Sequence, residues 1–243
     1  MSMNVDLTVQ LGFHGRRRSK GAVRLSAASV GGASAWAGSY HVLFMGRHYD
    51  DYVVTRRVIQ FPPIPGLPPI HGYRRLTGKI RAASVTGNIG ESVAAIVARR
   101  KLKLAITEIV PMQPDPRLRS PDYLMLVGPH MPALFRRVIP VGRSFQWPNW
   151  WPVESKARTT EEGARTARRD ALRQLAAYWS ALTARGANTV GFGIVVTLVF
   201  HPPREVLASL IIPRRQQRLR TLLTGRDVRD IADHDLTTCL YEC

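Results

Sequence analysis

The chain has 243 residues, of which 35 are Lys or Arg and 17 are Asp or Glu, giving a formal net charge of +18 at pH 7. Hydrophobic residues make up 45% of the sequence, which allows a packed core and excludes wholesale disorder. A basic excess of this size is typical of proteins that bind a polyanion, because basic side chains that neutralise phosphates release condensed counterions. Most of the basic residues are arginines, whose planar guanidinium groups suit phosphate. We therefore expect a nucleic acid as partner, with an anionic membrane surface as the alternative.

The cysteines and the apolar runs limit the setting of the protein. Cys239 and Cys243 are too few for a disulfide framework, and His234 near them adds a third metal ligand but no fourth. The N-terminus lacks an apolar stretch of the signal-peptide type. The longest apolar run, residues 191–200, is about half the length needed to cross a bilayer. These features predict a cytoplasmic protein that does not span a membrane.

Residues 1–85 are predicted to form a β-rich region that ends in a proline-rich connector. Apolar and polar residues alternate as in strands over residues 4–13, 38–46 and 49–61. Arg16, Arg17, Arg18 and Lys20 form a basic cluster after the first of these stretches. The prolines of residues 61–72 exclude a helix interior and a central strand, so we interpret this segment as an extended connector.

The hydrophobic pattern then changes and predicts an α/β core over residues 86–213. It opens with a helix that has Asn88 as N-cap and Glu91 in its first turn. Strands are predicted at 102–110, 121–127 and 152–157, a long helix at about 160–185, a buried strand at 190–200, and a strand or short helix at 205–213. This order indicates a mixed sheet flanked by helices, with residues 128–150 as an inserted loop and residues 214–243 as a basic, helix-like tail.

Two acidic residues and a lysine are the main candidates for chemistry. Asp122 lies at the head of one predicted strand and Glu154 on the next. If these strands are neighbours, the two carboxylates meet at one end of the sheet and offer the hard oxygen ligands that Mg²⁺ requires, with the backbone carbonyl of Ser155 as a further ligand. Lys156 shares a face with Glu154, where its ammonium group can orient water and offset charge on a phosphate. For Glu154 and Lys156 alone, an ion pair on a solvated strand is the alternative.

Pro121-Asp122 followed by Glu154-Ser155-Lys156 resembles the motif that names the PD-(D/E)XK nuclease superfamily. The resemblance covers about residues 86–200 and implies a restriction-endonuclease-like core. It implies that Asp122 and Glu154 bind Mg²⁺ or Mn²⁺ and that Lys156 positions the attacking water.

Two further elements support the same resemblance. Glu91 lies on the helix where many members of the superfamily supply another acidic residue, which implies that it helps directly or through water. Gln174 and Tyr178 are similar to the QxxxY element of RecB-like members and share one helix face. In the family that face looks towards the active site, which implies that Gln174 and Tyr178 fix the substrate backbone or the lysine.

The chain also departs from the family pattern. Asp122 and Glu154 are 32 residues apart, further than a hairpin-like connection requires, so residues 128–150 must be inserted. Pro114-Asp115 is a second PD pair, but Pro116 follows it, whereas an apolar strand follows Asp122 at once. We therefore prefer Asp122.

The implied activity is metal-dependent endonucleolytic cleavage of DNA, leaving 5′-phosphate and 3′-hydroxyl ends, in a restriction or phage-defence setting. A homodimer or a place in a larger complex is expected for such an enzyme. Two alternatives stay open: a non-catalytic nucleic-acid-binding subunit on a nuclease-like scaffold, and a relative that cuts RNA or junctions.

Arginines and tryptophans provide further candidate contacts to nucleic acid. The helix group lies on the predicted long helix and consists of Arg165, Arg168, Arg169 and Arg173. The tail group consists of Arg214, Arg215, Arg218 and Arg220. A solvated face is the alternative for both groups. Trp147, Trp150 and Trp151 form either a small local core, which is favoured, or a surface for stacking on bases.

Overall fold

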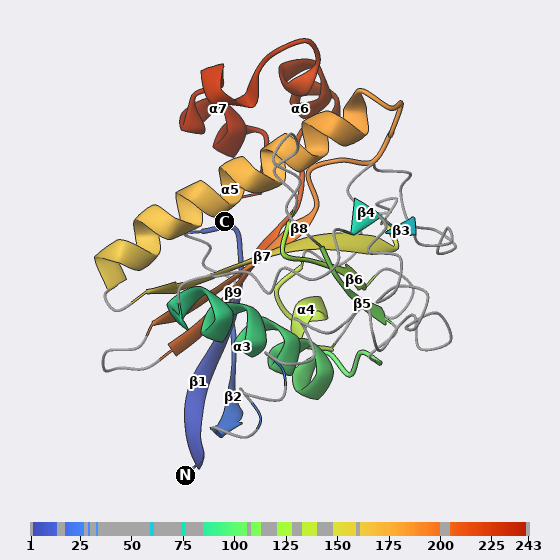
Figure 1. Ribbon diagram of the computed structural model, residues 1–243. Coiled ribbons are helices and arrows are strands. Elements are labelled where there is room, and N and C mark those ends of the chain that lie inside the picture. Colours follow the sequence, from blue (N-terminus) through green and yellow to red (C-terminus); the bar gives the residue numbers. More distant parts are fainter. Residues whose placement is uncertain are drawn as a thin grey trace.

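The protein is an α/β structure built on one mixed sheet of seven strands (Figure 1). The computed structural model describes residues 2–13, 18–26, 29, 33, 59–60, 74–75, 85–105, 108–112, 121–127, 133–139, 148–158, 161–199 and 205–241. The strand order is β2-β1-β9-β8-β7-β6-β5. These strands are β1 (Ser2–Leu11), β2 (Arg18–Ser26), β5 (Ile109–Pro111), β6 (Tyr123–Leu126), β7 (Trp150–Arg158), β8 (Gly193–Val199) and β9 (Glu205–Ile211). The predicted α/β class with a mixed sheet is confirmed.

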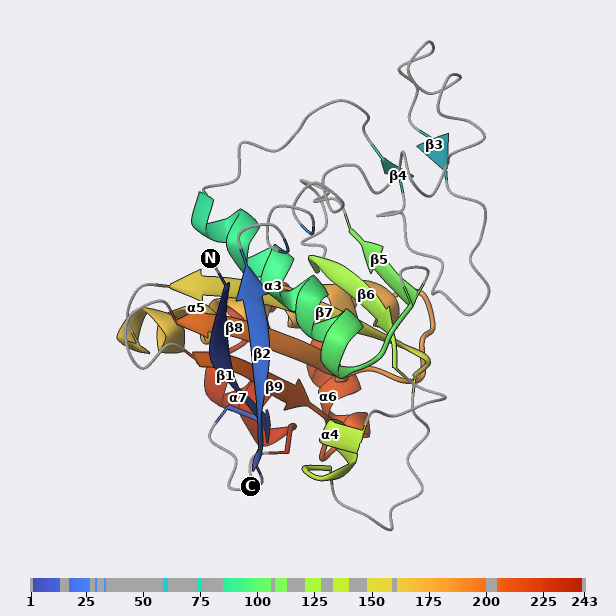
Figure 2. The same ribbon diagram turned by 90° about the horizontal axis from the view of Figure 1, so that it is seen from below.

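Two long helices cover opposite faces of the sheet, α3 (Val85–Lys101) on one and α5 (Glu161–Thr183) on the other. Figure 2 shows α3 on the near side of the strands and α5 behind them. The C-terminal part folds into α6 (Gln216–Leu223), a 3₁₀-helix (Val228–Asp230) and α7 (Asp233–Thr238), which lie on the outer side of α5. A short helix, α4 (Ala133–Arg136), lies within the predicted insertion.

The register of the central strands brings the candidate residues together. β6 and β7 are antiparallel, with Tyr123 opposite Val153, so Asp122 lies just before the strand at the level of Glu154. β7 and β8 are parallel, with Glu154 opposite Val195. Parallel neighbours need a crossover connection, and α5 is that connection. The expectation that the strands of Asp122 and Glu154 are neighbours is therefore confirmed.

The N-terminal strands belong to the same sheet as the predicted core. β1 pairs parallel with β9 and antiparallel with β2. The side-chain amide Nε2 of Gln10 donates a hydrogen bond to Oγ of Ser209 over 3.2 Å, which links the two ends of the chain. Of the other predicted N-terminal elements, the structure describes β3 (Ile59–Gln60) paired with β4 (Arg74–Arg75). The predicted strand at 38–46 and the connector at 61–72 lie outside the described residues.

Helices cover both faces of β7 and β8, which explains why β8 is almost continuously apolar and why Glu154 and Ser155 of β7 are buried although they are polar. The Trp151 ring packs against Phe135 and Phe192, with ring centroids 6.3 and 5.5 Å apart. Trp150 is only 6% exposed and Trp151 is fully buried, so neither can stack on bases. Both belong to β7 rather than to the inserted loop, and Trp147 lies outside the described residues.

Two predicted boundaries at α3 were wrong. The helix begins at Val85, so Asn88 is inside it and Glu91 falls in the second turn. The predicted strand at 102–110 is reduced to the three residues of β5, because the chain turns after α3. Lys103 has a φ of 60°, and the N–H of Leu102 donates to the carbonyl of Val97 over 3.2 Å. A left-handed backbone of this kind ends a helix and cannot continue directly as a strand.

Candidate active site

Asp122 is held in place by Ser155 at the point where β6 begins. Both the backbone N–H and the Oγ hydroxyl of Ser155 donate hydrogen bonds of 2.7 Å to Oδ2 of Asp122. The backbone carbonyl of Asp122 in turn accepts a hydrogen bond of 2.8 Å from the N–H of Met112, next to β5. The carboxylate is therefore fixed between β6 and β7, with its other oxygen, Oδ1, outside these two bonds.

Glu154 and Lys156 project from the face of the sheet that α5 covers. A Cβ built on Gly193 of β8 would meet a side-chain atom of Leu175 in α5 at 2.9 Å, so this position of β8 faces α5. Side chains of β7 and β8 alternate in register, so Glu154 and Lys156 share that face. The ammonium group of Lys156 contacts Oε1 of Glu154, with Lys156 17% exposed and Glu154 fully buried. This pair is therefore not the solvated surface pair of the alternative interpretation.

The carboxyl group of Glu154 is in an unfavourable environment for a negative charge. Its pKa is raised from 4.5 to about 8: burial is the largest cause and the nearby charge of Asp122 the next, while Lys156 and a backbone hydrogen bond from Asp122 act in the opposite direction. Its second oxygen, Oε2, is buried without a hydrogen-bond partner. Burying a carboxylate oxygen costs free energy unless a proton, a donor or a cation compensates it. When Glu154 ionises, a cation beside its carboxylate and that of Asp122 would offset this cost.

Glu91 approaches this site from the opposite face of the sheet. The Tyr123 hydroxyl donates a hydrogen bond of 3.1 Å to the backbone carbonyl of Glu91, which ties α3 to β6. Burial raises the pKa of Tyr123 well above its usual value, and the charges of Glu91 and Asp122 raise it further, so both carboxylates lie near its ring. Within the described part of the chain, no three His, Cys, Asp or Glu side chains form a group that could hold a metal ion. The role of Glu91 stays a prediction.

Gln174 and Tyr178 lie on α5, which covers the face bearing Glu154 and Lys156. Tyr178 is buried and Gln174 is half-buried. Gln174 follows Leu172 by two residues, about 200° around the helix, so the two point to opposite flanks. Leu172 lines a cavity beside α7 and Phe13, which places Gln174 on the flank turned away from β1. This orientation is compatible with the predicted role of Gln174 and Tyr178 but does not test it.

The arginines of the helix group divide into two sets. Arg165, Arg168 and Arg169 line the cavity just mentioned. Arg173 instead pairs with Asp233, Nε to Oδ1 at 2.8 Å, and so links α5 to α7. Its ion pair is a competing structural role for a residue predicted to contact nucleic acid.

The tail arginines lie around the start of α6. Arg214, Arg215 and Arg218 are exposed, and the backbone N–H groups of Arg214 and Arg215 donate to the carbonyl of Cys239. Arg220 is partly buried, and its Nε is buried without a hydrogen-bond partner. The Cys239 thiol is buried, and burial raises its pKa. The thiol is therefore a core side chain.

Several contributors were missed at the level of sequence. Tyr123 follows Asp122 directly, and its position on a predicted strand gave no reason to expect a contact with Glu91. Ser155 was predicted only as a carbonyl ligand, whereas its N–H and hydroxyl orient Asp122. The preferred Asp122 takes part in the site, and Asp115 lies outside the described residues.

The comparisons with known proteins identified no relative of this chain. Among the described residues, helices that combine the length and the apolarity of a membrane span are absent. Comparison of the chain with models of protein families, with curated proteins and with solved structures gave no match.

Proposed function

We propose that this protein is a metal-dependent endonuclease that hydrolyses phosphodiester bonds of DNA. The observation that carries the proposal is the buried Glu154 carboxyl group, which has an unpartnered oxygen, a pKa near 8, a second carboxylate at Asp122 and a lysine in contact. A net charge of +18 supplies the attraction for a phosphate backbone.

The residues present fit a divalent cation. Asp122 and Glu154 would hold it through carboxylate oxygens, the hard ligands that Mg²⁺ and Mn²⁺ prefer. Positive charge there would remove the penalty of the buried Oε2 and of the two neighbouring negative charges. When bound, such an ion activates water for attack on phosphorus and stabilises the charge that develops on the phosphate.

The protein side chains have separate tasks in this proposal. Lys156 keeps its ammonium group beside Glu154 and partly open to solvent, where it can hold a water molecule and pair with a phosphate oxygen. Ser155 fixes the orientation of Asp122 through two donors. Gln174 and Tyr178 would position the substrate backbone or Lys156 from α5.

A non-catalytic nucleic-acid-binding subunit is the second candidate. It is favoured by the three arginines that line one cavity on α5. A binding subunit gives the buried Glu154 no role. Its carboxyl group has a raised pKa, and once ionised it would weaken the binding of a nearby phosphate. The nuclease accounts for both features, so we prefer it.

The test is cleavage of supercoiled plasmid by the purified protein with Mg²⁺ or Mn²⁺, beside a sample with EDTA. The Lys156→Ala variant is compared with Lys20→Ala, which removes an exposed lysine from β2. We expect metal-dependent cutting that falls at least about 100-fold in Lys156→Ala and persists in Lys20→Ala. Retardation of DNA without any cutting by the wild type would support the binding subunit instead. A parallel set with single-stranded and structured RNA distinguishes an RNA- or junction-cutting enzyme.

A further inference from the structure

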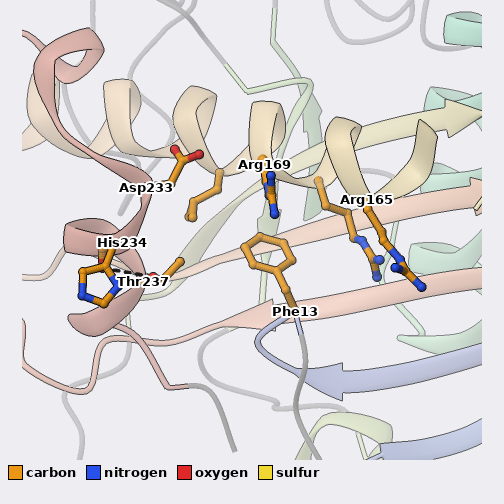
Figure 3. Close-up of a pocket in the computed structure, with 8 residues that line it drawn as sticks. Phe13, Arg165, Arg169, Asp233, His234 and Thr237 are labelled. Carbon is orange, nitrogen blue, oxygen red and sulfur yellow. Dashed lines mark hydrogen bonds between the residues drawn. The ribbon is translucent and has the colours of Figure 1, made fainter. Parts of the chain in front are cut away.

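A second concave site lies on the other flank of α5, away from Gln174. Figure 3 shows this cavity between α5, α7 and Phe13, in the turn that follows β1. Its volume is about 500 Å³, within the range of small-ligand sites in proteins. In the sheet, β9 and β8 separate β1 from β7, so the cavity is distinct from the Asp122–Glu154 site.

The lining of this cavity is strongly basic. Arg165, Arg168 and Arg169 are three and four positions apart on α5, so they share one face of the helix. Among the described residues, the one carboxylate in the lining belongs to Asp233, and it is paired with Arg173. The described lining thus carries three guanidinium groups, each with several N–H donors, against one carboxylate. The cavity therefore favours an anion, and guanidinium groups bind phosphate oxygens in pairs.

The aromatic ring of Phe13 forms part of the remaining wall, which also includes Leu172, His234 and Thr237. The ring of Phe13 lies beneath α5, beside the side chains of Arg165 and Arg169 (Figure 3). The turn that presents it is fixed by Gln10, whose Nε2 donates to the carbonyls of Gly12 and Phe13 over 3.1 and 2.9 Å. Gly12 has a φ of 66°, a left-handed conformation that glycine adopts without a steric penalty. An ordered aromatic ring beside guanidinium groups matches a base joined to a phosphate.

We infer that this cavity binds a nucleoside phosphate, with the phosphate on the three arginines and the base against Phe13. The same chemistry is present in a free nucleotide and in one unit of a nucleic-acid strand. The inference is independent of the proposed nuclease, because it needs neither Asp122 nor Glu154.

Binding is measured by titration calorimetry at fixed salt and with EDTA, which keeps metal-dependent binding elsewhere out of the signal. The probes are inorganic phosphate, deoxyadenosine monophosphate and a short single strand of DNA. The variants are Arg169→Gln and Phe13→Leu, with Arg226→Gln as the matched control, because Arg226 is an exposed arginine outside the cavity. Circular dichroism shows that each variant is folded.

We expect Arg169→Gln to weaken binding of the nucleotide about tenfold or more and Arg226→Gln to leave it within about twofold. Phe13→Leu is expected to weaken the nucleotide but not inorganic phosphate. Tighter binding of the monophosphate than of phosphate alone supports a free nucleotide as the source. Binding of the strand alone, with the same variant pattern, supports a nucleic-acid strand.

Three results would overturn the inference. Equal losses in Arg169→Gln and Arg226→Gln would mean a diffuse charge effect instead of a site. Equal affinity for phosphate and for both nucleotide probes, unchanged in Phe13→Leu, would exclude recognition of a nucleoside. Absence of binding by all probes to the folded wild type would exclude the site altogether.

Discussion

Ser155 donates twice to the same oxygen of Asp122, once from its backbone N–H and once from its hydroxyl, each over 2.7 Å. Two donors on one carboxylate oxygen fix both the position and the rotation of the group. Asp122 lies outside β6, so the strand pairing alone would leave its side chain free to turn. A residue in the middle of the proposed E-x-K motif thus orients the acidic residue of the PD pair.

Ser155→Ala is predicted to weaken this orientation without removing it, because the backbone N–H still donates to Asp122. We expect a loss of about 1 kcal/mol in the free energy of unfolding and a partial loss of cleavage. Urea denaturation and plasmid cleavage measure the two effects. Ser209→Ala is the matched control, since it removes another buried hydroxyl, on β9, that accepts a bond from Gln10. Equal cleavage by both variants would contradict the positioning role of Ser155.

Asp122→Asn is predicted to keep the fold and lose the activity. The amide oxygen of Asn can still accept both bonds from Ser155, so the expected change in the free energy of unfolding is within about 1 kcal/mol. The negative charge is lost, and with it a candidate metal ligand, so cleavage should fall by about 100-fold or more. The measurement is a cleavage time course with Mg²⁺ beside thermal unfolding. Activity close to that of the wild type would remove Asp122 from the site.

The raised pKa of Glu154 predicts a pH-dependent stability. A folded-state pKa near 8, against 4.5 for the free group, means that the folded protein binds one more proton than the unfolded chain between those pH values. The contribution of Glu154 to the free energy of unfolding is therefore complete below about pH 4.5. It is lost as the pH rises to about 8, and the free energy of unfolding falls by at most about 1.4 kcal/mol per pH unit. Burial is the main cause, so the loss reflects the cost of ionising a buried group.

Glu154→Gln tests this, because glutamine does not titrate. Relative to the wild type, the variant should gain stability as the pH rises from about 5 to about 8 in the presence of EDTA. Urea unfolding of both proteins at three pH values gives the difference between their free energies of unfolding. A difference that does not change with pH would contradict the raised pKa. Added Mg²⁺ should stabilise the wild type most at about pH 8, where the ionised carboxylate is available.

Gly90→Ala is predicted to separate α3 from β7. A Cβ at this position would meet both Cβ and N of Ala157 at 3.2 Å, and neither atom belongs to a flexible side chain. Overpacking of this kind typically costs about 1–3 kcal/mol, measured as a lower midpoint of thermal unfolding. Gly21→Ala in β2 is the control, since the nearest atom to its added Cβ is 4.0 Å away. A Gly90→Ala protein as stable as this control would show that α3 can shift at no cost.

Elements whose apolar residues follow one regular spacing were predictable from sequence. Elements that depend on partners distant in the chain were not. The strand β8 and the helix of Gln174 were predicted because burial imposes continuous apolar spacing on the first and helical apolar spacing on the second. β2 was missed, because its outer face is basic and only alternate residues such as Val23 and Leu25 are buried. Arg18 and Lys20 were taken as a basic cluster although they occupy the exposed face of an edge strand. Lysines on such a strand discourage pairing with another chain.

The two candidate sites differ in the same way in how far the sequence predicts them. Asp122, Glu154 and Lys156 were predictable, because two neighbouring strands and a spacing of two residues bring them together. The cavity on α5 was not, because Phe13 and Asp233 reach it from opposite ends of the chain. Its arginines stood out in the sequence only as a charged helix face, and nothing local shows what lies across from that face.

The pairing of β1 with β9 has a consequence for synthesis and folding. Thr8 lies opposite Leu207, so β1 leaves the ribosome about 200 residues before the strand β9 with which it pairs. Until β9 emerges, the apolar side chains of β1 have only β2 as a neighbour, and a two-stranded hairpin is marginally stable in water. Pairing over such a long loop slows folding and prolongs the exposure of unpaired strands. We therefore expect slow, concentration-sensitive refolding of this chain, with aggregation as its main competitor.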